Sequence, residues 1–416
     1  MHMITNLTAK ELSIKNELLA FLEKANNLQT NYTQIKLVLI CMIFHNRNEG
    51  RILLRQESPS ERTRYLKGLI NEISFKFSCE LFNEDANWQD EEIIYGAIEL
   101  VETLTPSPEH LFNAIRQISY SKNTRIRSRY NHAIIAPIIK MMIGDISNVW
   151  LYDEYADLGE MTSLFGDGQY FLNEPNQEKY LVLFLMNQLV PSLSISNVNP
   201  LISTVNNDYN IYISLPTIQM LSPEEIEDWK KTNLIPNPKL SKFASAAVHL
   251  QKALKFLNLL SANEGMPQNK LAFVLTNASF LAKTGYDQKV RSRLLKDNFL
   301  KAIIHLPNEV SSEHLYIIVL SNQSNLNIEF YNLRTGFALN QSGEISLSDG
   351  QLQKIDLKEI KKHPKKSFIV DDYQNDVNVS NKGKMSGSTY QQLEEASQAF
   401  YESDGKLKGL LNKLNF

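Results

Sequence analysis

Hydrophobic positions change their spacing near residue 145. Before residue 120, apolar residues recur at helical spacing, as at Leu12, Leu18 and Leu22, and this pattern predicts helices. Beyond the change, short continuous apolar runs alternate with helix-length stretches; the runs are residues 149–152, 211–213, 271–275, 302–304 and 316–320. Buried strands that alternate with helices are typical of a sheet covered on both faces. The pattern therefore predicts an α/β protein with a helical N-terminal region.

The same pattern predicts three domains. Residues 1–125 are expected to form an N-terminal helical domain, residues 126–370 an α/β domain, and residues 371–416 a linker and a helical tail. The linker is predicted because the stretch after residue 370 is rich in Asn, Ser, Gly and Lys. A looser apolar run at residues 328–331 is predicted to be an edge strand.

Composition excludes several classes of protein. The chain has 416 residues, of which 43% are hydrophobic and 21% are charged, so wholesale disorder is excluded. Its two cysteines, Cys41 and Cys79, have no zinc or disulfide spacing, which predicts a metal-free protein of the reducing cytoplasm. The apolar run at residues 37–44 is too short to span a membrane. A formal net charge of −3 does not indicate nucleic acid, although a local basic patch can still bind it.

The most informative motif covers residues 271–307. An apolar strand is followed by Thr276-Asn277 and a Leu-containing turn, then by Gly285, a basic helix, and a second strand that ends in Leu306-Pro307. This order resembles the C-terminal half of the catalytic domain in N6-adenine DNA methyltransferases, above all the modification subunits of type I restriction systems. The resemblance implies a Rossmann-like S-adenosylmethionine-dependent methyltransferase domain preceded by an N-terminal helical domain.

The resemblance also implies where S-adenosylmethionine would bind. The family motif Asp-Pro-x-x-Gly-x-Gly follows an apolar strand, and residues 153–159 occupy its place. Asp153 and Gly159 match the motif, whereas Glu154 replaces the proline and Asp157 replaces the first glycine. An aspartate adds a side chain and a charge where the backbone should touch the cofactor, and it does not adopt positive φ freely.

Glu174 is the candidate for the acid that would hold the ribose of the cofactor. It lies 21 residues after Asp153, close to the spacing expected in nucleotide-binding folds. An acid placed near a helix N-terminus is the alternative interpretation of Glu174.

The position of the adenine clamp departs furthest from the family. The resemblance implies an Asn-Pro-Pro-Phe motif, whose Asn side chain and first Pro carbonyl accept hydrogen bonds from the adenine amine while the aromatic ring stacks on the base. The sequence there is Leu215-Pro216-Thr217-Ile218. Leucine cannot accept a hydrogen bond and isoleucine cannot stack as a ring does, so we predict no catalytic residue here. A second Asn-Pro at residues 237–238 follows no apolar strand.

Basic residues supply candidate phosphate contacts. Arg125, Arg127 and Arg129 alternate just before Tyr130, where the family carries an aromatic-Thr-Pro segment. They are predicted to contact nucleic acid, with a solvated basic face as the alternative. The same alternative applies to Lys289, Arg291 and Arg293 and to the basic run at residues 361–366.

The sequence thus predicts a methyltransferase-like pseudoenzyme in which binding of S-adenosylmethionine is doubtful. It would act as a DNA-binding or assembly subunit of a DNA-modification or phage-defence complex, with DNA and other modification or specificity subunits as partners. The alternative is an active S-adenosylmethionine-dependent adenine-N6 methyltransferase with a divergent active site. A third possibility is an α/β protein whose likeness to the family is accidental.

Overall fold

The computed structural model describes most of the chain. The described residues are 8–23, 28–46, 58–77, 80–82, 90–119, 129–144, 149–164, 168–190, 193–204, 208–218, 221–231, 245–258, 269–311, 313–334, 336–339 and 345–373. The chain divides into two compact units, Met1–Phe368 and Ile369–Phe416. Of the second unit, the description includes only the 3-10 helix η2 (Val370–Tyr373), so the predicted tail lies outside the described residues. The predicted boundary at residues 125–126 also lies outside them and stays a prediction.

The N-terminal region is helical, as predicted. Its described helices are α1 (Ala9–Glu23), α2 (Leu28–Asn46), α4 (Pro59–Phe77), α5 (Glu91–Leu104) and α6 (Pro108–Ile118). Helix α6 begins at Ser107, whose side chain caps the backbone of His110, and Pro108 occupies its first turn. Helix α2 is buried between α5 and α8 (Gln177–Leu189), and Lys36 on α2 forms an ion pair of 2.8 Å with Glu178 on α8.

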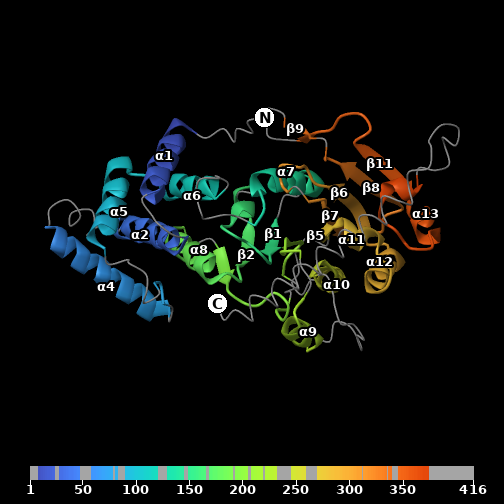
Figure 1. Ribbon diagram of the computed structural model, residues 1–416, viewed down its shortest axis with the longest axis horizontal. Helices are drawn as coiled ribbons and strands as arrows, with labels where there is room; N and C mark the ends of the chain where they lie inside the picture. Colours follow the sequence, from blue (N-terminus) through green and yellow to red (C-terminus); the bar gives the residue numbers. More distant parts are fainter. Residues whose placement is uncertain are drawn as a thin grey trace, which may run out of the picture. The chain divides into compact units, whose positions relative to one another are not determined.

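A nine-stranded sheet forms the centre of the first unit (Figure 1). The strand order is β11-β8-β6-β7-β5-β4-β1-β2-β3. Strands β3, β2, β1, β4 and β5 are parallel, and β7 runs antiparallel between β5 and β6. The strands are β1 (Trp150–Asp153), β2 (Gln169–Asn173), β3 (Leu193–Ser196), β4 (Ile211–Ser214), β5 (Leu271–Asn277), β6 (Leu300–His305), β7 (Leu315–Ser321), β8 (Asn327–Asn332) and β11 (Leu352–Asp356). A separate ribbon pairs β9 (Ala338–Leu339) with β10 (Ile345–Ser346).

Helices lie on both faces of this sheet, which confirms the predicted layer architecture. In Figure 1, α7 (His132–Ile143) lies above the sheet, and α10 (Ser245–Asn258) and α12 (Tyr286–Lys296) lie below it. The remaining helices are η1 (Glu160–Leu164), α9 (Pro223–Lys230), α11 (Ala278–Ala282) and α13 (Leu357–Lys362). Among the described residues, no helix is both long and apolar enough to cross a membrane.

The five predicted core strands correspond to β1, β4, β5, β6 and β7. The prediction of an edge strand at residues 328–331 is wrong, because β8 pairs with β6 on one side and with β11 on the other. Strand β11 went unpredicted, and it covers the edge that β8 would otherwise expose.

Arg291 holds the end of the methyltransferase-like block together. A solvated or phosphate-binding side chain was the expectation, and it is wrong for this residue, since Arg291 is fully buried. Its guanidinium donates to the carbonyls of Lys283 (2.8 Å), Lys365 (3.0 Å) and Lys366 (2.8 Å), and also to that of Phe280. One cation therefore joins α11, α12 and the turn after α13.

We expect Arg291→Met to lower the free energy of unfolding by about 2–4 kcal/mol, because four backbone carbonyls, among them the buried one of Phe280, would lose a charged donor. Chemical denaturation measures the loss. Arg293→Met, on the exposed side of the same helix, is the matched control. Equal losses in the two variants would contradict the structural role of Arg291.

Candidate functional site

The tips of β1, β2 and β4 bring the candidate residues together. Asp153 at the end of β1 pairs in register with Leu172 on β2 and with Ile213 on β4. The carboxyl ends of parallel strands meet at one edge of a sheet, which is where α/β folds bind ligands. Asp153, Glu174 and Leu215, which are distant in sequence, therefore share this edge.

The turn after β1 has the left-handed backbone that the family motif requires. Asp157 has φ of 54° and Gly159 has φ of 72°. The expectation that an aspartate would resist positive φ is wrong here, because Asp tolerates the left-handed region better than most residues. Its carboxylate is also held in place: it accepts a hydrogen bond from the backbone amide of Arg129 (2.8 Å) and forms an ion pair with Lys179.

The charge on Asp157 is compensated inside the protein. Burial alone would raise its pKa, but Lys179, His132 and Arg129 together lower the pKa below its usual value. Asp157 is therefore an anion surrounded by the cations of its own chain. Its side chain occupies the place where the family motif leaves open backbone.

Gly159 is required for packing. A Cβ atom at this position would lie 3.1 Å from Leu183 Cδ2 and 3.3 Å from Leu172 Cδ1, in addition to the strain of its positive φ. Next to it, Arg116 of α6 donates to the carbonyl of Leu158 and to Thr162 Oγ1, both at 3.1 Å. The glycine thus allows β2 and α8 to approach the turn, and its contact with a cofactor stays a prediction.

Glu174, the candidate ribose acid, is completely buried and already accepts three hydrogen bonds. Its Oε1 atom accepts from Arg129 Nη2 (2.5 Å) and from the amide of Asn176 (2.8 Å), and Oε2 accepts from the amide of Asp157 (2.7 Å). Burial raises the pKa of Glu174 even though Arg129 lies beside it. A ribose diol would have to displace these donors.

Arg129 points into the protein. Its side chain is 17% exposed, and its guanidinium lies 4.9 Å from the ring centre of Tyr155 while it pairs with Glu174. A phosphate contact by Arg129 stays a prediction that this geometry does not favour. Arg125 and Arg127 lie outside the described residues.

Asp153 is a buried carboxyl with one free oxygen. Its Oδ1 atom accepts from the amide of Tyr155 (3.2 Å), and within the described part of the chain Oδ2 has no hydrogen-bond partner. Burial raises the pKa of Asp153 well above its usual value. Its role in cofactor binding stays a prediction.

The adenine clamp has been replaced by core packing. Leu215 is 1% exposed and belongs to the hydrophobic core, and Ile218 packs against that core. Thr217 is exposed. The carbonyl of Pro216, the one acceptor that the family motif would retain here, accepts a hydrogen bond of 2.8 Å from the Tyr130 hydroxyl.

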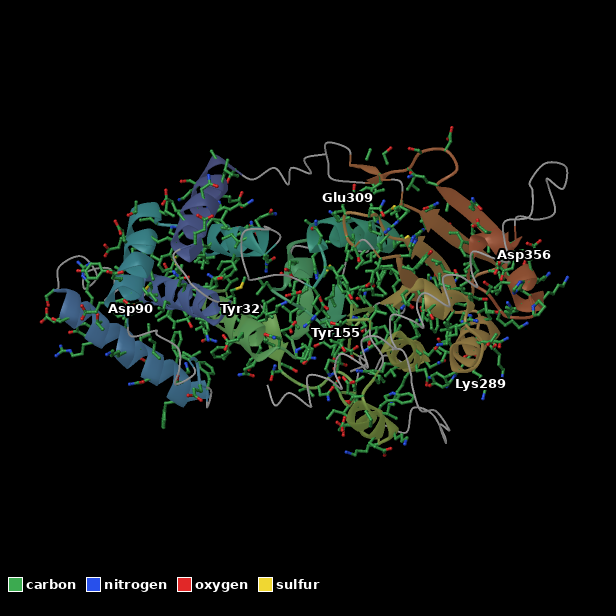
Figure 2. All side chains as sticks on the ribbon, in the orientation of Figure 1. Tyr32, Asp90, Tyr155, Lys289, Glu309 and Asp356 are labelled. Atoms are coloured by element: carbon green, nitrogen blue, oxygen red, sulfur yellow. The ribbon has the colours of Figure 1, made fainter. Side chains whose placement is uncertain are left out.

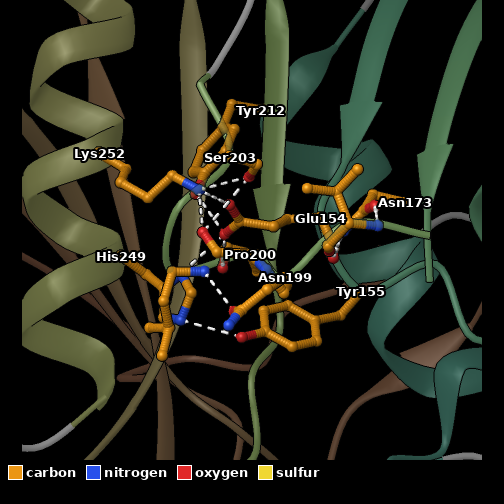
Figure 3. Close-up of polar contacts among 12 residues, drawn as sticks. Glu154, Tyr155, Asn173, Asn199, Pro200, Ser203, Tyr212, His249 and Lys252 are labelled. Carbon is orange, nitrogen blue, oxygen red and sulfur yellow. Dashed lines mark hydrogen bonds and ion pairs between the residues drawn. The ribbon is translucent and has the colours of Figure 1, made fainter. Parts of the chain in front are cut away.

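A second buried cluster surrounds Glu154, which stands where the family has proline (Figure 3). Its Oε2 atom accepts from Tyr212 (2.6 Å) and Ser214 (2.8 Å) on β4 and contacts His249 Nδ1 (2.7 Å) on α10. Its Oε1 atom pairs with Lys252, which also donates to Ser203 (3.1 Å). The Glu154 cluster therefore joins β1, β4, α10 and the loop after β3.

The cluster extends to the neighbouring residue in the turn. His249 Nε2 lies 3.1 Å from the Tyr155 hydroxyl (Figure 3), and the Arg129 guanidinium lies over the ring of Tyr155. Burial alone would raise the pKa of Glu154, but Lys252 and His249 lower it to about 2. Sequence reasoning missed these partners, and the only signal was an acid in place of a proline at the end of a buried strand.

These residues do not fit S-adenosylmethionine as they stand. The Glu174 carboxylate already accepts three hydrogen bonds, one of them from Arg129, and the Pro216 carbonyl is bonded to Tyr130. The side chain of Asp157 stands where the family has glycine, and it is paired within the protein. For a metal ion, the described ranges contain no group of three or more His, Cys, Asp or Glu side chains able to hold one.

Comparisons with known proteins agree with this fold. The family model for N-6 DNA methylase matches residues 205–398. The methyltransferase subunit of a type I restriction-modification system from Streptococcus thermophilus is similar, with 12% identity over 84% of this chain and 97% of that one and a TM-score of 0.54. A modification subunit of a putative type I restriction enzyme from Vibrio vulnificus YJ016 has 12% identity over 85% and 93%, with a TM-score of 0.54.

A third similar structure was solved in a study of complex assembly and conformational transition of the type I restriction-modification system. It has 11% identity over 99% of both chains, with a TM-score of 0.58. A search of curated proteins finds no match. The predicted Rossmann-like methyltransferase fold and the predicted likeness to type I modification subunits are confirmed.

Removing the cation of the Glu154 cluster should destabilise the protein. We expect Lys252→Met to lower the free energy of unfolding by about 3–5 kcal/mol, because a buried carboxylate would lose its main counter-charge. The double variant Glu154→Gln/Lys252→Met should recover much of this loss. Lys231→Met, which removes an exposed ion pair with Asp228, should change stability little. No recovery in the double variant would refute the pairing.

The same cluster predicts an acid-sensitive contribution to stability. The pKa of Glu154 is about 2 in the folded protein against 4.5 for the unfolded chain. Because the pKa of Glu154 is lower in the folded protein, its ionised carboxylate stabilises the fold by an amount on the order of 3 kcal/mol at pH values above 4.5. This contribution is lost as the pH falls from 4.5 toward the folded pKa of about 2. When the free energy of unfolding is measured at successively lower pH, it should fall less steeply for Glu154→Gln than for the unchanged chain. Parallel curves would contradict the prediction.

Proposed function

We propose that this chain, which has the fold of type I modification subunits, is a catalytically impaired methyltransferase-like protein. It acts as an assembly or DNA-binding subunit of a cytoplasmic DNA-modification or phage-defence complex. Its partners are DNA and other modification or specificity subunits. S-adenosylmethionine, the cofactor that the family resemblance implies, is not held by the chain in this arrangement.

One observation carries the proposal: two consecutive residues bond to the two groups that a methyltransferase would offer its ligands. Arg129 donates to Glu174 and Tyr130 donates to the Pro216 carbonyl. The first acceptor would hold the ribose of the cofactor and the second would hold the amine of adenine. The segment before α7 thus takes the place of both ligands.

The energetic cost of displacing this segment is large. A cofactor that binds Glu174 must separate a buried ion pair and leave Arg129 without its partner, which costs about 3–5 kcal/mol. That cost weakens the apparent affinity of a ligand by about two to four orders of magnitude. Even with the segment displaced, Leu215 would offer no acceptor for the adenine amine.

The role in assembly is supported by the similar structure that comes from a study of type I complex assembly, since it covers nearly the whole of both chains. The alternative function, an active adenine-N6 methyltransferase with a divergent site, is favoured by one observation. Asp153 and Glu174 lie at the strand tips where a cofactor would bind. That function requires the segment before α7 to move away.

Calorimetry with S-adenosylmethionine and a methylation assay on mixed-sequence duplex DNA test the proposal. We expect no binding at millimolar ligand and no transfer of labelled methyl groups, because both acceptors are occupied. An N6-adenine methyltransferase of known activity serves as the positive control. Methyl transfer to adenine by this chain would overturn the proposal and establish the alternative.

A further inference from the structure

Exposed cations gather on one side of α12. Lys289, Arg293 and Lys296 follow one another at intervals of four and three residues, which places them on the same helix face. All three are exposed, whereas Val290 and Leu294 on the opposite face are buried. Helix α12 therefore turns a basic stripe to solvent (Figure 2, which labels Lys289).

A second basic segment follows β11. The side chains of Lys358, Lys362 and Lys365 are exposed, while Leu357 and Ile360 of α13 are buried. This segment contains the run at residues 361–366 that the sequence singled out as basic.

The fold joins these two segments, which lie some 70 positions apart in the chain, into one surface. Gln288 Nε2 donates to the carbonyl of Pro364 (2.9 Å), and Lys361 Nζ donates to Asn298 Oδ1 (2.6 Å). Between these two contacts, Arg291 holds the backbone after α13. Figure 1 shows α12 and α13 side by side. The α12–α13 surface is defined as the exposed cations Lys283, Lys289, Arg293, Lys296, Lys358, Lys362 and Lys365. Hydrogen bonds between the two segments hold it together.

The charge of this surface is strongly unbalanced. Of the ten Lys and Arg residues in 283–297 and 356–366, seven are exposed, and of the four Asp and Glu residues, three are exposed, whereas the whole chain has a formal net charge of −3. One of the four acids, Asp287, is buried. Among the described residues, no carboxylate forms an ion pair with Lys289, Arg293 or Lys362. These cations are therefore available to an external polyanion.

The composition of the surface distinguishes between possible partners. Protein interfaces have an apolar centre that is depleted of lysine, whereas interfaces with DNA are polar and strongly basic. None of the exposed large hydrophobic side chains of the described chain lies within residues 283–297 or 356–366. The surface therefore fits a phosphate backbone better than it fits a protein.

We propose that the α12–α13 surface binds the phosphate backbone of duplex DNA without reading its sequence. The choice of duplex DNA, rather than another polyanion, rests on the proposed function. The tips of β1, β2 and β4 take no part in this contact, so binding requires neither S-adenosylmethionine nor an open adenine pocket. Lysine and arginine would displace counterions from the duplex, which makes the affinity depend steeply on salt.

Fluorescence anisotropy with a labelled mixed-sequence duplex, titrated at several salt concentrations, tests the proposal. The variant Lys289→Gln/Arg293→Gln/Lys362→Gln should weaken binding about tenfold or more at low salt and reduce the slope of log K against log salt by about three, one for each phosphate contact. The matched control, Lys10→Gln/Arg64→Gln/Lys76→Gln, makes the same change of charge on the N-terminal helices and should bind as the unchanged chain does.

Two smaller variants test whether the segments act as one surface. Lys289→Gln/Arg293→Gln and Lys362→Gln/Lys365→Gln should each reduce the slope by about two. Equal affinity and slope for the triple variant and its control would overturn the proposal, and so would an effect confined to one segment. All substituted residues are exposed, and thermal unfolding verifies that each variant folds. A negative result here leaves the calorimetric test of the proposed function unaffected, so the two failures can be told apart.

Discussion

The ion pair between Arg129 and Glu174 determines the character of the site. A buried carboxylate is stable only when donors and a counter-charge surround it. In a ligand-binding site, part of that set comes from the ligand, but here the chain supplies all of it. The amides of Asp157 and Asn176 donate, and the counter-charge comes from Arg129, 45 positions upstream. Once Arg129 is in place, its backbone amide also holds Asp157, so an aspartate can occupy a position that would otherwise suit glycine. The departures from the family motif therefore depend on one another.

Glu154 follows the same principle on the other side of the turn. Replacing a proline at the end of β1 by an acid buries a second negative charge, and Lys252 and His249 on α10 compensate for it. The turn after β1 thus contains two buried anions with compensated charge. Asp157 pairs with α8 and with the segment before α7, and Glu154 pairs with α10. These polar contacts cross-link the turn to α8, to α10 and to the segment before α7.

Much of the fold could be predicted from the sequence, because a short continuous apolar run indicates a buried strand. The five core strands and the block at residues 271–307 were found in this way. Strands β2 and β3 went unpredicted because they are short and half polar, as in the run Leu193–Ser196. The edge that carries Asp153, Glu174 and Leu215 was also predictable, since the tips of parallel strands coincide.

The contents of the site could not be predicted to the same degree. Hydrophobic spacing indicates that a residue is buried but does not identify its partner. His249 contacts Glu154 across 95 positions of sequence, and nothing local marks that pairing. The inward orientation of Arg129 could not be predicted for a related reason. Three alternating arginines suggest a solvated basic face, and the sequence does not show that one of them pairs with Glu174.

Arg116 has a consequence for how the chain can be divided. Its guanidinium links α6 to the turn after β1, while α2 covers α8 and contributes Lys36 to an ion pair there. A fragment that began at α7 would leave the Leu158 carbonyl without its donor and would expose the apolar side of α8 to water. The change in hydrophobic spacing near residue 145 therefore marks a change of sequence pattern, and side-chain contacts extend across it.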